Sequence, residues 1–110
     1  MSNTLHFRHN KDALTINYFV VAEGVAYGTA YCSRKDQFCK RTGRLLAEES
    51  LLESLENTVP IGRGATQQQI VLAILMDILL TGDFPRNAEE LLYIQCFNFT
   101  HMVLDNKRFK

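Results

Sequence analysis

Few features of this sequence mark it as a specialised class of protein. It has three cysteines, two prolines and no tryptophan in 110 residues, and its twelve acids balance twelve lysines and arginines. Hydrophobic residues make up 46% and charged residues 22%, which excludes a disordered, collagen-like or disulfide-rich chain. Zero net charge excludes a global attraction to nucleic acid or anionic membranes, so any such attraction must be local. We expect one domain with a single core.

Long apolar segments are also lacking. The longest run, Ile70 to Leu80, contains Asp77 and is shorter than the roughly 20 residues of a membrane helix. The opening MSNTLHFRHNKD has no apolar signal segment, and the cysteines, which are odd in number, are Cys32, Cys39 and Cys96. We therefore expect a cytoplasmic protein with free thiols that serve as packing groups.

The first third of the chain predicts an antiparallel β-meander. Thr, Tyr, Phe, Val and Ile are frequent over residues 4–10, 13–22 and 25–32. Turn-forming residues at 10–12 and 23–24 separate these three strands, which favours hairpin connections between them.

The remainder predicts about three helices, over 34–56, 67–81 and 88–105. Each begins with a capping pattern, in which two side chains three positions apart bind free backbone N–H groups: Ser33 with Asp36, Thr66 with Gln69, and Asn87 with Glu90. A loop with one proline and two glycines ends the first helix, and Gly82 ends the second. The third segment has an alternative interpretation as a strand over 91–104, because aromatic and β-branched residues are frequent there. The expected fold class is α+β.

The helix at 67–81 is apolar on nearly every side. Such a helix must be enclosed by other elements. Two interpretations follow: a central core helix, or a helix at a subunit interface of a homo-oligomer.

Positive charge is concentrated in one segment, CSRKDQFCKRTGR (32–44), which holds five cations and one acid. Cations there surround the N-terminus of the predicted helix, which is the positive end of its dipole, and glutamates lie near its C-terminus. This distribution of charge is unfavourable, because the dipole favours acids at the N-terminus and bases at the C-terminus. Two kinds of partner would offset the unfavourable charge: an internal ion pair such as Arg44 with Glu48, and an external anion such as a phosphate. A solvated charged face is the alternative interpretation. The proposed phosphate ligands here are Ser33, Arg34, Lys35 and Arg44.

Other residues are candidates to complete a nucleotide site. Arg63 lies between two glycines, and Arg108 lies in the basic end NKRFK; each alone is more typical of a mobile loop or tail. A base needs an aromatic platform and an amide, for which Phe84, Phe97 and Asn98 are candidates. The alternative is that these phenylalanines are core residues.

Sequence motifs for catalysis are lacking. There is no GxxxxGK[ST], GxGxxG or GxSxG pattern, so hydrolysis of nucleotides, dinucleotide redox chemistry and hydrolase chemistry find no support. His6 and His9 should face opposite sides of a strand, and Cys32 and Cys39 lack the spacing of a zinc knuckle. We expect no enzyme activity, no metal and no cofactor.

One segment resembles a known family. Residues 24–51, GVAYGTAYCSRKDQFCKRTGRLLAEESL, combine a strand ending in Cys-Ser, then Lys-Asp-x-Phe, then Gly-Arg and a helix. This pattern resembles small phage proteins, and among them the first family of Thoeris anti-defence proteins, which sequester cyclic ADP-ribose signals made by bacterial TIR-domain proteins. Relatives of this kind are expected to repeat Gly-Arg near the helix end, where this chain has EESL (48–51).

The resemblance implies a homo-oligomeric binder, a dimer or larger, with pockets at subunit boundaries in the host cytoplasm. It implies phosphate contacts by Arg34 and Arg44 and a weaker one by Arg108 with Asp105, and Asp105 is also a candidate base or ribose ligand. The first functional hypothesis is therefore sequestration, without cleavage, of a cyclic ADP-ribose isomer or a cyclic oligonucleotide. The alternatives are an oligomeric inhibitor that binds a host protein, and a small nucleic-acid-binding protein.

Overall fold

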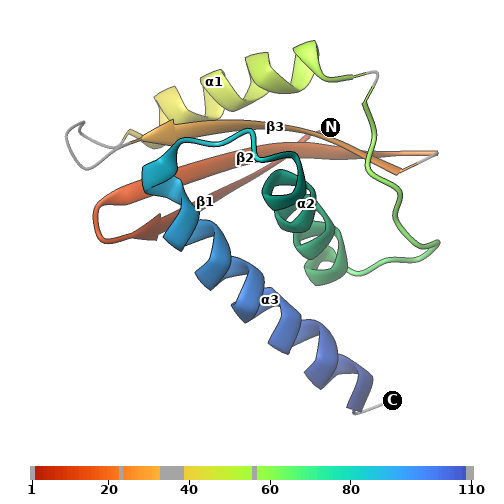
Figure 1. The fold of residues 1–110 in the computed structure, drawn as a ribbon. Coiled ribbons are helices and arrows are strands. Elements are labelled where there is room, and N and C mark those ends of the chain that lie inside the picture. The colour runs from red at the N-terminus through yellow and green to blue at the C-terminus, as the bar shows by residue number, and fades with distance from the viewer. Residues whose placement is uncertain (1, 23, 33–38, 56, 109–110) are drawn as a thin grey trace.

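The computed structural model describes residues 2–22, 24–32, 39–55 and 57–108, with side chains described as far as 105 (Figure 1). Three strands come first, β1 (Asn3–His9), β2 (Asp12–Val21) and β3 (Gly24–Cys32). They form one antiparallel sheet in the order β1-β2-β3, so the predicted meander is confirmed. Asn10 and Lys11 have positive φ values of 49° and 70°, the conformation of a two-residue hairpin turn that matches the strand twist.

Helices cover both faces of this sheet, which makes the domain α+β (Figure 1). Helix α1 (Lys40–Glu53) lies on one face, and helices α2 (Gln67–Thr81) and α3 (Glu89–Arg108) lie on the other. Side chains alternate between the faces along each strand, so β2 contributes to both layers. None of the helices in the described part of the chain is long and apolar enough to cross a membrane.

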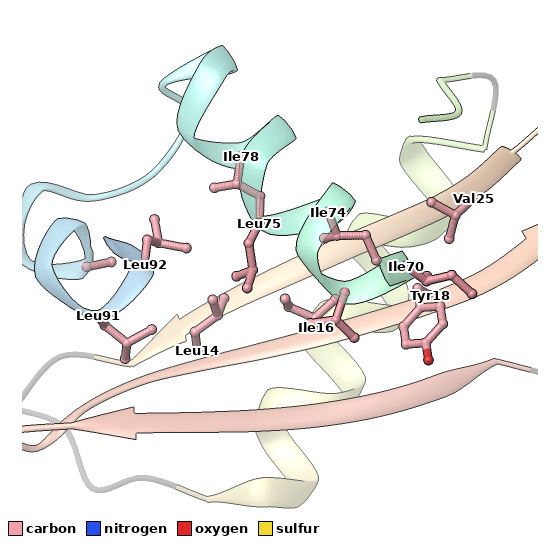
Figure 2. Packing of buried hydrophobic residues seen from close by; sticks show 12 residues of the cluster. Leu14, Ile16, Tyr18, Val25, Ile70, Ile74, Leu75, Ile78, Leu91 and Leu92 are labelled. Carbon is pink, nitrogen blue, oxygen red and sulfur yellow. The ribbon is translucent and has the colours of Figure 1, made fainter. Parts of the chain in front are cut away.

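The main core lies between the sheet and the pair α2 and α3 (Figure 2). Alternate residues of β2 point into it, and α2 covers them with a buried stripe. The fully enclosed side chains include Leu14, Ile16, Ile74, Leu75, Leu91 and Leu92. Helix α2 is thus a core helix on one side, yet Met76 and Leu80 on its other side remain 49% and 83% exposed.

Helix α2 begins and ends where the sequence predicts. Both hydrogen bonds of the capping box are present, from Gln69 N to Thr66 Oγ1 (3.2 Å) and from Thr66 N to Gln69 Oε1 (2.8 Å). Gly82 ends the helix in the left-handed conformation, with φ of 70°.

The last segment is a helix, so its interpretation as a strand is wrong. Its predicted cap is also wrong, because Asn87 lies inside a short 3-10 helix, η1 (Arg86–Ala88), that precedes α3. The Asn87 amide instead donates a hydrogen bond to Asp12 Oδ1 (3.1 Å), which ties η1 to the start of β2. Phe84 packs against the core just before η1.

Helix α1 begins later than predicted. Cys39 is extended, with φ of −129°, so a continuous helix from Arg34 is wrong and α1 starts at Lys40. The predicted capping pair Ser33 and Asp36 lies outside the described residues. The helix ends at Glu53, close to the predicted position.

A glycine sets the distance between α1 and the sheet. A Cβ atom built on Gly28 of β3 would lie 2.1 Å from Leu51 N and 2.3 Å from Ala47 O. Ala47 and Leu51 are the buried residues of α1, and they press the helix backbone directly onto β3. Helix α1 therefore rests on β3 and β2, and the same face of β1 is left largely uncovered.

Candidate functional site

Three cations gather at the start of α1. Lys40, Arg41 and Arg44 are all exposed, and the first turn contains no acidic residue. In the part of the chain that the structure describes, none of the three forms an ion pair with a carboxylate. The predicted internal pair between Arg44 and Glu48 is therefore not formed. The positive end of the helix dipole is reinforced by these cations instead of being neutralised.

The thiol of the N-cap residue, Cys39, also lies in this positive environment. Its side chain makes no capping hydrogen bond. The thiol is exposed, so the expectation that it is a packing group is wrong. The thiolate form is the one that N–H and O–H groups of the first turn favour: the backbone and side chain of Thr42, then the backbone and charge of Arg41, lower the pKa of the Cys39 thiol. Negative charge is thus stabilised at this helix end.

The positive field extends over β1. His6 Nδ1 lies 2.9 Å from Thr15 Oγ1 on the sheet face that α1 covers. Burial, followed by the charges of Lys40 and Arg44, lowers the pKa of His6. Two of the three cations of α1 therefore act electrostatically on His6 of β1.

The other predicted phosphate ligands lie elsewhere. Arg63 is exposed in the loop that borders the β2–β3 turn, at the opposite end of the sheet from the start of α1 (Figure 1). Arg108 belongs to α3, and its side chain lies outside the described part, as do Ser33, Arg34 and Lys35. Arg44 is thus brought together with Lys40 and Arg41, but not with Arg63.

The predicted base ligands do not meet Arg44 within one chain. Phe97, Asn98 and Asp105 are exposed on α3, across the sheet from α1 (Figure 1). The Phe97 ring packs edge-on against His101, with ring centres 4.5 Å apart. Phe84 is half-buried against the core, as its alternative interpretation stated. A site shared by Arg44 and Phe97 would need a second chain.

A second cleft, of about 340 Å³, was missed by sequence reasoning. It lies between β3 and the ends of α1 and α2, and hydroxyl groups and two carboxylates line it. Tyr27 Oη donates a 2.7 Å hydrogen bond to Asp77 Oδ2, and burial together with this bond raises the pKa of Tyr27. Its residues come from distant positions without a common spacing, so no local signal marks it.

Together, the fold and site define a small α+β domain with a cationic helix end beside an open strand face. Comparison with protein-family models, curated proteins and solved structures found no match for the chain. Within the described ranges, no group of three or more His, Cys, Asp or Glu side chains is placed to hold a metal ion.

Acidification should destabilise the fold through His6. Because the folded pKa of His6 lies below 6.5, the unfolded chain binds the proton more readily, and stability falls as the pH drops through 6.5. Urea unfolding at about pH 7.5 and about pH 5.5 measures the loss. In His6→Gln the pH-dependent loss should be smaller; an equal loss in both proteins would show that His6 is not responsible.

Proposed function

We propose that the protein binds a phosphate-bearing nucleotide signal and sequesters it without cleaving it, with a cyclic ADP-ribose isomer as the first candidate. The supporting observation is the set of three cations, Lys40, Arg41 and Arg44, at the start of α1, none of which forms an ion pair with a carboxylate of the described residues. Each cation there costs about 0.3 to 1 kcal/mol against the helix dipole. A bound phosphate turns this unfavourable arrangement into a favourable one.

The family resemblance supplies the ligand class for this proposal. The matching segment includes β3 and the first turns of α1. Of the two arginines that the resemblance assigns to phosphate, Arg44 is the one that the structure describes, and it lies beside Lys40 and Arg41 at the start of α1. Arg44 forms no ion pair with Glu48, so the predicted pair does not offset the charge of Arg44 at this helix end.

We further propose that the protein acts as a homo-oligomer. Apolar side chains on α2 and α3 remain exposed in one chain, with Leu80 at 83% and Phe97 at 65%. Tyr93, Phe97 and Leu104 repeat at helical spacing along α3, the pattern of a packed helix seam. A second chain on this surface would cover them, and sedimentation analysis of the full chain measures whether a dimer or larger assembly forms.

The same apolar surface favours a second candidate, an inhibitor that binds a host protein. Exposed apolar patches mark interaction sites, and this one needs no nucleotide. A monomer that takes up no nucleotide would favour this candidate. Binding to DNA with a steep salt dependence would instead favour the nucleic-acid alternative, against which the zero net charge argues.

The decisive experiment is ligand depletion. The protein is incubated with a cyclic ADP-ribose isomer, and free ligand is measured before and after heat denaturation. We expect depletion followed by recovery of intact ligand; a cleaved product would indicate an enzyme. The double variant Lys40→Glu with Arg44→Glu should weaken uptake about a hundredfold, because two charge-assisted contacts are lost.

The matched control is Arg86→Glu. Arg86 is an exposed arginine in η1, in the helical layer on the opposite face of the sheet. It should leave uptake unchanged, and the size of the assembly should be the same in all variants. Equal uptake by the double variant and the wild type would show that the cations of α1 are only a solvated face.

A further inference from the structure

Helix α3 is longer than the surface on which it packs. Its side chains in the core cluster are Leu91, Leu92, Cys96 and Phe99. None of the described side chains after Phe99 belongs to this cluster, and the helix extends away from the sheet as far as Arg108 (Figure 1). Because most helical stability in proteins comes from the packing of an apolar face, this outer part of α3 needs another surface to pack on.

An apolar stripe runs along the exposed side of α3. Tyr93, Phe97 and Leu104 are each at least 50% exposed, and Thr100, which is also exposed, lies between the last two. Their separations of four, three and four residues are those of the seam between two paired helices. Phe97 and Phe99 are two positions apart and point to nearly opposite sides of the helix, so the stripe is separate from the face that packs on the core.

The two ends of this stripe carry opposite charges. Glu89 and Glu90 are exposed in the first turn of α3. In the sequence, Lys107 and Arg108 occupy the last turn. Glu90 and Lys107 continue the spacing of the seam by three positions at either end. Two copies that pair in the same direction would place like charges together, whereas opposite directions bring acids beside bases.

We propose that two copies of the chain associate through their α3 helices, which pack side by side in opposite directions. A two-fold axis between positions 98 and 99 sets Tyr93 of one copy opposite Leu104 of the other. It also sets Phe97 opposite Thr100, whose small side chain leaves room for the ring. The acidic first turn of each helix then lies beside the basic last turn of the other. The inference rests on the proposed homo-oligomer and adds its contact surface, direction and register.

The cations of α1 remain outside this contact. Helix α1 lies on the opposite face of the sheet from α3 (Figure 1). Pairing of the α3 helices therefore joins two chains without covering Lys40, Arg41 or Arg44. Association is measured without nucleotide, so its outcome does not depend on the proposed ligand.

Two charge reversals test the direction of the helices. Glu89→Lys with Glu90→Lys, and separately Lys107→Glu with Arg108→Glu, bring like charges together at both ends of the pair. Each double variant should associate about tenfold more weakly than the wild type in sedimentation of the full chain at low salt. An equimolar mixture of the two should recover the wild-type association, because a mixed pair again has opposite charges at both ends.

Two control variants isolate the charges of α3. Glu49→Lys with Glu53→Lys makes the same change of net charge on exposed residues of α1, and His9→Ala removes the contact between His9 Nε2 and Glu90 Oε1 (3.3 Å). Both should associate as the wild type does. Unchanged association of both α3 reversals would overturn the inference and leave the homo-oligomer in place, whereas a wild-type chain that stays monomeric would reject both.

Phe97→Gln tests the apolar stripe without a change of charge. Phe97 is 65% exposed in one chain, so the variant should fold normally, which circular dichroism and thermal unfolding check. It should associate about tenfold more weakly than the wild type, because burial of the ring is lost. Leu46→Gln, at an exposed leucine of α1, is the matched control and should leave association unchanged. Equal association of the two variants would show that this stripe is not the contact.

Discussion

Gly28→Ala is expected to lower the free energy of unfolding by about 3 kcal/mol, because a Cβ atom at this position would overlap the α1 backbone. The atoms it meets are Leu51 N and Ala47 O, which cannot rotate aside as a side chain can. The helix must therefore move off β3, and the cations at its start move with it. Thermal unfolding should show a loss on the order of 10 °C, and ligand uptake should fall with it.

Gly62→Ala is the control for this substitution. A Cβ atom at Gly62 meets no other atom within 4 Å, and Gly62 is not among the positive-φ residues. Its stability should match or slightly exceed that of the wild type, because alanine restricts the unfolded chain. A stable Gly28→Ala protein with normal uptake would contradict the direct contact between α1 and the sheet.

Ile74→Ala should be comparably destabilising, by about 3 kcal/mol, for a different reason. Ile74 is fully buried at the centre of the α2 stripe, facing the sheet (Figure 2). Its truncation loses apolar burial and leaves a cavity between α2 and β2. Urea unfolding measures the change as a shift of the midpoint.

Leu80→Ala on the same helix is the matched control, since 83% of the Leu80 side chain is exposed. In one chain this substitution should change stability by less than about 0.5 kcal/mol. In a homo-oligomer that uses α2, however, it should weaken association. Sedimentation of Leu80→Ala measures association, and urea unfolding measures its stability. Weaker association with unchanged stability would show that this side of α2 lies at an interface and not in the core.

Much of the fold was predictable because its signals are local. The strands follow from residue types, the first hairpin from Asn10 and Lys11, and the second helix from Thr66, Gln69 and Gly82. Each of these signals works through hydrogen bonds or dihedral angles within a few residues. Errors arose where a longer-range contact prevailed: Asn87 binds Asp12, 75 residues away in the chain, instead of capping α3.

The candidate site was predictable only in part. The concentration of cations was evident, and Arg44 lies at the expected helix end. The helix begins six residues later than predicted, and the partner Glu48 is not used. The burial of Asn17 had no sequence signal, because whether an asparagine in a strand is buried depends on the element that packs over it.

The sequence by itself determined the order of the elements, the two faces of each strand and the unbalanced charge at one helix end. These properties depend on residue type and spacing alone. Tertiary structure decided that α1 rests on Gly28 over β3 and β2 and leaves β1 open. It also decided that Asn17 is buried under that helix with an unused acceptor, and that apolar side chains of α2 and α3 remain outside the core. These features depend on close packing between segments that are distant in the sequence, and no local sequence pattern predicts such packing.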